Sequence, residues 1–171
     1  MIIRITAKLG KKIGKVPLKV LPLDKNPYAD WSAHLFYAGR AQYILITNTV
    51  SLYSMVIFGQ GITTDYRFLD QLTHRMSDFI RWDGHEVIYE RLIIPSLDRF
   101  FFSKALNQAV TGSMNDLVRL AKHHLADGTV APFDVSFLLN KKPVKYLKFL
   151  NPKEAFKKLG EKWGIGVLRF V

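Results

Sequence analysis

Cysteine is absent from this sequence of 171 residues. Its absence excludes disulfide bonds, thiolate zinc sites, cysteine-ligated iron–sulfur clusters and a cysteine nucleophile, and it is typical of proteins from a reducing compartment. The N-terminus also lacks the apolar stretch of a secretory signal, because Arg4, Lys8, Lys11 and Lys12 interrupt it. We therefore expect a cytoplasmic protein.

Long hydrophobic runs are missing as well. Residues 41–64 carry no charge, but nine of them are Gln, Asn, Ser or Thr, and Gly59 and Gly61 interrupt the end of the stretch. A membrane-spanning helix needs about 20 predominantly apolar residues. We interpret the stretch as strands, and the sequence predicts no membrane partner.

Acidic residues are scarce, with 14 Asp and Glu against 25 Lys and Arg, which gives a net charge of +11. Residues 1–25 carry a net charge of +6, residues 26–140 carry −2 and residues 141–171 carry +7. If the two basic ends adjoin in space, they form one patch that attracts polyanions. The predicted nucleic-acid-binding residues are Lys8, Lys11, Lys12, Lys15, Lys141, Lys142, Lys145, Lys157 and Lys158.

The hydrophobic pattern indicates the fold. Residues 31–38, 42–47 and 52–58 are rich in aromatic and β-branched residues, and the links between them are short enough only for antiparallel hairpins. The third of these strands is apolar on both alternating faces, so we expect cover on both sides. Further strands are predicted at residues 2–5 and 98–103, with another strand or hairpin within 135–150, and a brief helix is predicted after Thr6.

Apolar residues at helical spacing predict amphipathic helices over residues 64–82, 113–125 and 152–163, the last with Asn151 as its N-cap. We therefore expect a single α+β domain over residues 1–171. Its sheet is largely antiparallel with a meander at its centre, and three amphipathic helices pack against it.

The string Gly112-Ser113-Met114-Asn115-Asp116 lies where the second of these helices is predicted to begin. The unpaired N–H groups of such a helix end can hold a phosphate or a carboxylate. Ser113 and Asp116 also have the spacing of a capping box, which explains both residues without any ligand.

Further along the same helix, Asp116, Arg119 and His123 fall on the side away from the apolar stripe. An acid, a guanidinium and an imidazole could carry out acid–base chemistry if the wall of a cleft covered them. The candidate catalytic residues are therefore Asn115, Asp116, Arg119 and His123, although an ordinary surface helix has the same composition. The histidines show no metal-ligand spacing, and no phosphate-binding loop or nucleophile elbow is present, so we predict no metal and no cofactor.

The Met-Ile-Ile-Arg start, Trp31 followed by Leu35-Phe36, the Gly-Ser-Met-Asn-Asp string and Asn140-Lys-Lys-Pro143 resemble an uncharacterised bacterial family of unknown function. The resemblance implies a small bacterial protein and a dedicated role for Asn115 and Asp116, and it brings no catalytic assignment.

Three functions stay open at this point. The first is a non-enzymatic basic module that contacts nucleic acid or another polyanion, such as an acidic protein. The second is a small hydrolase or transferase with its site on the 113–125 helix. The third is a homo-oligomer, such as a homodimer that binds a partner without chemistry.

Overall fold

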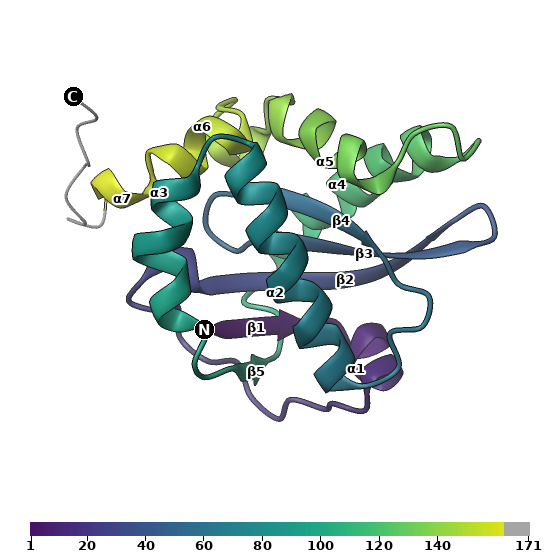
Figure 1. Cartoon of the computed structure of the whole chain (residues 1–171), viewed down its shortest axis with the longest axis horizontal. Helices are drawn as coiled ribbons and strands as arrows, with labels where there is room; N and C mark the ends of the chain where they lie inside the picture. The colour runs from purple at the N-terminus through teal and green to yellow at the C-terminus, as the bar shows by residue number, and fades with distance from the viewer. Residues whose placement is uncertain (163–171) are drawn as a thin grey trace.

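Five strands form one sheet in the order β4-β3-β2-β1-β5, in a computed structural model that describes residues 1–162 (Figure 1). Their bounds are Ile2–Ile5 for β1, Asp30–Ala38 for β2, Ala41–Asn48 for β3, Ser54–Phe58 for β4 and Phe101–Ser103 for β5. Strands β2, β3 and β4 form the predicted antiparallel meander, whereas β1 pairs in parallel with both β2 and β5. The predicted α+β class, with its largely antiparallel sheet, is confirmed.

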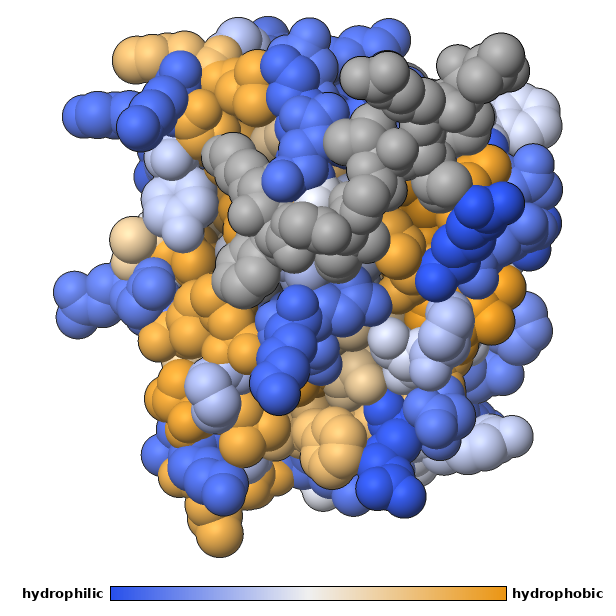
Figure 2. All heavy atoms as spheres, turned by 90° about the vertical axis from the view of Figure 1, so that its left-hand side faces the viewer, coloured by the Kyte–Doolittle hydropathy of each residue, from blue (hydrophilic) through white to orange (hydrophobic). Residues whose placement is uncertain are grey.

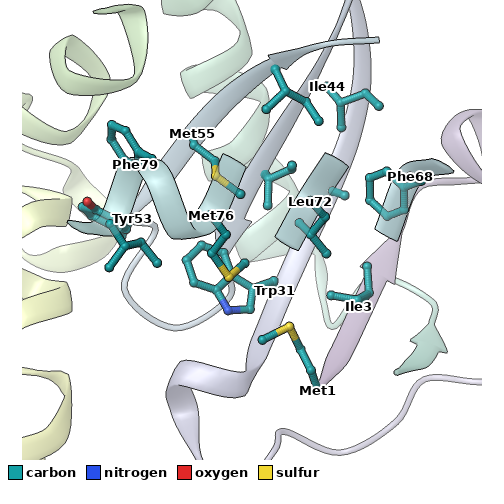
Figure 3. Packing of buried hydrophobic residues seen from close by; sticks show 14 of the residues in the cluster. Met1, Ile3, Trp31, Ile44, Tyr53, Met55, Phe68, Leu72, Met76 and Phe79 are labelled. Atoms are coloured by element: carbon teal, nitrogen blue, oxygen red, sulfur yellow. The ribbon is translucent and has the colours of Figure 1, made fainter. Parts of the chain in front are cut away.

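Helices cover both faces of the sheet. Helix α2 (Asp65–Trp82) lies on one face, and α4 (Gln108–Leu125) lies on the other (Figure 1). Strand β4 contributes Met55 and Ile57 to the α2 side and Val56 to the α4 side, as its two apolar faces predicted. On the α2 side, Phe68, Leu72 and Met76 point toward the sheet in the same cluster as Trp31 (Figure 3). The buried faces of both helices therefore follow from the spacing of their apolar residues.

Helix α4 begins five residues before its predicted start. Asn107 is the N-cap, and its side-chain oxygen accepts a hydrogen bond from the Val110 N–H. Ser113 lies inside the helix, where its hydroxyl donates to the Ala109 carbonyl. The predicted capping box and the predicted anion cradle at Gly112-Ser113 are therefore wrong, because those residues lie within a continuous helix.

Helix α5 (Pro132–Lys141) occupies the region predicted to be a strand or a hairpin. It packs against the outer edge of β4, where Ser136 Oγ accepts a hydrogen bond from the Val56 N–H at 2.8 Å and Asn140 Oδ1 accepts one from the Ser54 N–H at 2.8 Å. These side chains take the place of a neighbouring strand. They satisfy backbone groups that an open sheet edge would expose.

The short helices lie at the two ends of the domain. Helix α1 (Ala7–Ile13) follows β1 directly and has Thr6 as its predicted cap. Helix α3 (Glu86–Ile88) leads into a π-helical turn (Tyr89–Ile93), and 3-10 turns lie at Pro27–Ala29, Ile94–Ser96 and Lys145–Leu147. The predicted C-terminal helix consists of α6 (Pro152–Lys157), capped by Asn151, and α7 (Leu159–Lys162); Trp163 lies outside the described residues.

Arg4 does not belong to the basic surface to which its position in the sequence assigned it. Its guanidinium is fully buried and forms two hydrogen bonds of 2.8 Å to the carboxylate of Asp30, which is also fully buried. Its other N–H groups donate to the Leu21 and Pro22 carbonyls and to Ser103 Oγ. This ion pair joins β1, β2 and β5 inside the protein, so it contributes nothing to an external patch.

Candidate functional site

The N-terminal basic segment and the described part of the C-terminal one, residues 141–162, lie at opposite ends of α2 (Figure 1). Lys15 Nζ contacts Asp65 Oδ2 at 2.8 Å at the start of the helix, and Lys153 Nζ contacts Asp83 Oδ1 at 2.6 Å just after its last residue. A helix of 18 residues is about 27 Å long. The helices α1 and α6 are therefore held apart, and their lysines do not form one continuous patch.

The C-terminal group of predicted lysines is exposed, and it is spread over α5, the following turn and α6. Figure 2 looks at the end of the molecule that carries α3 and α6, and hydrophilic side chains there form separate clusters divided by hydrophobic ones. Of this group, Lys157 lines a cavity beside Asp83. The exposed members are Lys141, Lys142, Lys145, Lys157 and Lys158.

A basic groove lies at the other end, where β2 extends past β1. Strand β1 pairs with β2 only as far as Ile5 and Ala33, and the chain then enters α1. The last part of β2 thus has no strand on that side, and α1 and α4 flank it instead. The groove has a volume of about 340 Å³, and its lining consists of Lys8, His34, Leu35, Phe36, Tyr37, Asn115, Val118, Arg119 and Lys122.

Helix α4 presents Asn115, Arg119 and Lys122 to the groove, because residues four and seven positions apart share one face of a helix. Lys8 reaches in from α1, and its ammonium group lies 4.4 Å from the centre of the Tyr37 ring. The lining contains three cationic side chains and no carboxylate. Among residues 1–162, Lys8 and Lys122 form no ion pair, and Arg119 has only an exposed contact of 3.4 Å with Asp116.

His34 gives the groove a polar group without a partner. Its Nδ1 atom is buried and forms no hydrogen bond within the described part of the chain. Burial lowers the pKa of His34, and the positive charges of Lys8 and Lys122 lower it further. The imidazole is therefore neutral at pH 7, and the positive charges close to it are not compensated by an anionic group of the lining.

Residues from two separate predictions meet in this groove. Lys8 comes from the predicted polyanion-binding group, whereas Asn115 and Arg119 come from the predicted catalytic group. Asp116 and His123, the predicted acid and imidazole, are exposed and do not line the groove. Neither Lys122 nor His34 was predicted to belong with these residues. The spacing from Asn115 to Lys122 was a usable signal for the lysine, but nothing in the sequence placed His34 opposite α4.

A second polar cluster lies where α2 ends, beside a cavity of about 520 Å³. The side chain of Asp83 is 5% exposed; its carboxylate accepts hydrogen bonds from Lys153 Nζ at 2.6 Å and from the Tyr53 hydroxyl at 2.8 Å. His85 Nε2 is 3.7 Å from Asp83 Oδ2 and has no hydrogen bond among residues 1–162. Burial lowers the pKa of His85 against the opposing effect of Asp83, and burial raises the pKa of Tyr53.

Two of the three cations that line this cavity are paired, whereas Lys157 is exposed and forms no ion pair among residues 1–162. Lys153 contacts Asp83, and Arg81 contacts Glu86 at 3.0 Å and Glu90 at 3.3 Å. Tyr53 also stacks on Phe156 of α6 with ring centres 4.2 Å apart. These contacts attach α6 to α2 and β4, so the cluster explains how the C-terminal helix is held in place. This cluster was not predicted, although Asp83-Gly84-His85 after the helix was a usable signal.

The described residues show neither a metal site nor a membrane-spanning helix. Among residues 1–162, no group of three or more His, Asp or Glu side chains is arranged to hold a metal ion. None of the helices formed by these residues has the length and apolar character required to cross a membrane.

Comparison with known proteins gives a family without an assigned function. The family model of a domain of unknown function, DUF6933, matches residues 2–155, which is nearly the whole chain. No curated protein and no solved structure matches the sequence.

Proposed function

We propose that this chain, which belongs to the DUF6933 family of domains of unknown function, is a non-enzymatic protein that binds a phosphate-bearing ligand in the groove between α1, β2 and α4. The observation that carries the proposal is the convergence of Lys8, Arg119 and Lys122 on a groove whose lining has no carboxylate.

Electrostatics supports an anionic ligand. Like charges that share a groove repel one another, and the repulsion grows where the surroundings exclude water. A phosphate group among the three cations replaces that repulsion with attraction and offers acceptor oxygens to the side-chain N–H groups. The amide of Asn115 adds a neutral donor to the same lining.

The size of the groove favours a small anionic group. Its volume of about 340 Å³ is at the lower end of the range of ligand pockets, which begins at about 300 Å³. It suits one or two phosphate groups. Two sources share this chemistry, namely a free phosphate ester and the backbone of a nucleic acid.

Calorimetry with inorganic pyrophosphate tests the proposal. We expect the wild-type protein to bind pyrophosphate and the Lys8→Gln/Lys122→Gln double variant to lose at least about tenfold in affinity, which corresponds to about 1.4 kcal/mol. The control is Lys141→Gln/Lys158→Gln, which removes the same charge at the other end of the molecule. Equal losses in both variants would show that only the net charge matters, and would contradict the proposal.

A second arm of the experiment separates the two sources of phosphate. A short single-stranded oligonucleotide is titrated in place of pyrophosphate, at low salt and at about 0.15 M salt. If the ligand is a free phosphate ester, pyrophosphate binds at both salt concentrations and the oligonucleotide gains nothing from its additional phosphates. If the source is a nucleic acid, the oligonucleotide binds more tightly than pyrophosphate, with a steep dependence on salt.

A further inference from the structure

The segment that follows α1 exposes apolar side chains in an alternating pattern. Val16 is 80% exposed, Leu18 is 86% exposed and Val20 is 49% exposed. The segment runs along the lower edge of the sheet in Figure 1, beside β5, and the Lys104 N–H donates a hydrogen bond to the Lys19 carbonyl. Three apolar side chains this close together and this exposed form a small hydrophobic strip, which we call the 16–20 strip.

The charged residues within the 16–20 strip and next to it in the sequence are all lysines. Lys15 and Lys19 lie within or next to it in the sequence, and the backbone hydrogen bond places Lys104 beside Lys19. The first acidic residue of the chain is Asp24. Lys15 reaches Asp65, whereas Lys19 and Lys104 are exposed and form no ion pair among residues 1–162. The surface that covers this strip therefore has to combine apolar and anionic character.

Two other kinds of occupant fit the strip less well. An added β-strand needs regularly spaced backbone N–H donors and acceptors, but Pro17 removes a donor within the strip and the Lys19 carbonyl already accepts from the Lys104 N–H. A second copy of this chain brings the same lysines against the first, at a net charge of +11 for each copy. Neither objection applies to a lipid surface, into which protruding side chains insert without a preformed pocket.

We propose that the 16–20 strip contacts an anionic phospholipid surface, with Val16 and Leu18 entering the boundary between headgroups and acyl chains and with Lys19 and Lys104 facing the headgroups. This mode combines buried apolar area with electrostatic attraction and gives reversible binding at the membrane surface. It revises the sequence-based expectation that no membrane is a partner. It is independent of the phosphate groove, because none of these residues lines that groove.

Co-sedimentation with vesicles tests the proposal on the full chain. Vesicles of phosphatidylcholine are compared with vesicles in which part of the lipid is phosphatidylglycerol. We expect the wild-type protein to sediment with the anionic vesicles only. Val16→Ser/Leu18→Ser should weaken this binding by at least about tenfold, since two apolar side chains no longer insert. Lys19→Gln/Lys104→Gln should also weaken it, and additional salt should abolish the difference that these lysines make.

The matched control is Trp82→Ser, which removes a side chain that is 77% exposed at the far end of α2. The control should bind as the wild type does. Unchanged binding of Val16→Ser/Leu18→Ser would overturn the proposal, because lysines alone would then account for the attraction. Absence of vesicle binding by the wild type would overturn it too. A sizing column on which only Val16→Ser/Leu18→Ser loses a dimer would assign the strip to a second copy of the chain.

Discussion

Positive charges gather at two places in the molecule, the end that carries α6 and the groove between α1, β2 and α4 (the α4 end), and the two places arrange these charges differently. At the α6 end, Lys153 is bonded to the buried carboxylate of Asp83, and Arg81 is shared between Glu86 and Glu90. At the α4 end, the cations converge on a groove whose lining has no carboxylate. Net charge along the sequence does not distinguish the two ends, whereas the pairing of the charges does.

This difference separates a cluster that holds the fold together from one that is available to a ligand. Breaking an ion pair that has one buried partner destabilises the fold, because the buried charge is then left without compensation. Cations that converge without a buried counter-charge contribute little to folding and attract anions from solution. We therefore assign the paired end to stability and the unpaired end to binding.

The largest expected effect is a loss of stability when the ion pair between Lys153 and Asp83 at the α6 end is broken. Lys153→Met leaves the carboxylate of Asp83 buried with only the Tyr53 hydroxyl as a side-chain donor, and we expect the free energy of unfolding to fall by about 2 kcal/mol. The estimate lies below the full cost of a broken buried pair because the Lys153 side chain is 40% exposed. Urea denaturation measures it. The control Lys157→Met, one turn further along α6, should change stability by less than about 0.5 kcal/mol; equal effects would contradict the assignment.

The next largest effect is a loss of affinity for the anion when a carboxylate is introduced into the groove, as at the α6 end. Asn115→Asp places a carboxylate among Lys8, Arg119 and Lys122, and we expect the affinity for pyrophosphate to fall by at least about tenfold while the fold is preserved. The matched control is Asn151→Asp at the α6 end, which makes the same chemical change at a position where Asp also caps a helix. Calorimetry compares the two variants. An undiminished affinity in Asn115→Asp would place the anion elsewhere.

A smaller change in stability is expected from a change in pH. His34 in the groove and His85 at the α6 end both contribute to it. Burial holds the pKa values of His34 and His85 below 6.5, their value in an unfolded chain. The unfolded state therefore binds more protons than the folded state in this window, so stability falls as the pH drops below about 6.5. Denaturation curves at several pH values should show this slope, and it should be reduced in His34→Gln and in His85→Gln. A slope unchanged by both substitutions would show that other groups cause it.

Much of the fold could be predicted from residue spacing. Thr6 and Asn151 identified the starts of α1 and α6, and the apolar stripe of residues 68–80 identified α2 together with the face that it buries. Local rules failed where tertiary contacts outweigh local preferences. Gly112 suggested a helix start, but α4 runs through it because Val110 and Met114 pack on the same side of the sheet.

The prediction of a strand or hairpin where α5 lies was wrong for a similar reason. Phe133, Val135 and Phe137 alternate as in a strand, yet the buried positions of α5 include Val135, Ser136, Leu139 and Asn140, which follow helical spacing. Pro132 at the first turn was the overlooked signal. The polar residues Ser136 and Asn140 face inward because the edge of β4 needs their hydrogen bonds, and a sequence pattern does not show that need.

The site could be predicted only in part. Lys8, Asn115 and Arg119 were candidates from composition and helical spacing, but two different functions were assigned to them. These three residues line one groove because β2 extends past β1 and leaves space between α1 and α4. His34 and Lys122 line the same groove. The distance between the two basic ends depends likewise on the placement of α1 and α6 along α2. These are long-range relations that one sequence does not specify.

An NMR titration of the two histidines tests the central claim most directly. The pKa values of His34 and His85 are measured with and without sulfate, an analogue of phosphate whose charge does not change near neutral pH. An anion held in the groove favours the imidazolium form, so the pKa of His34 should rise with sulfate while that of His85 stays where it is. A pKa of His34 that does not respond to sulfate, or a rise at His85 in its place, would contradict the assignment of ligand binding to the unpaired end.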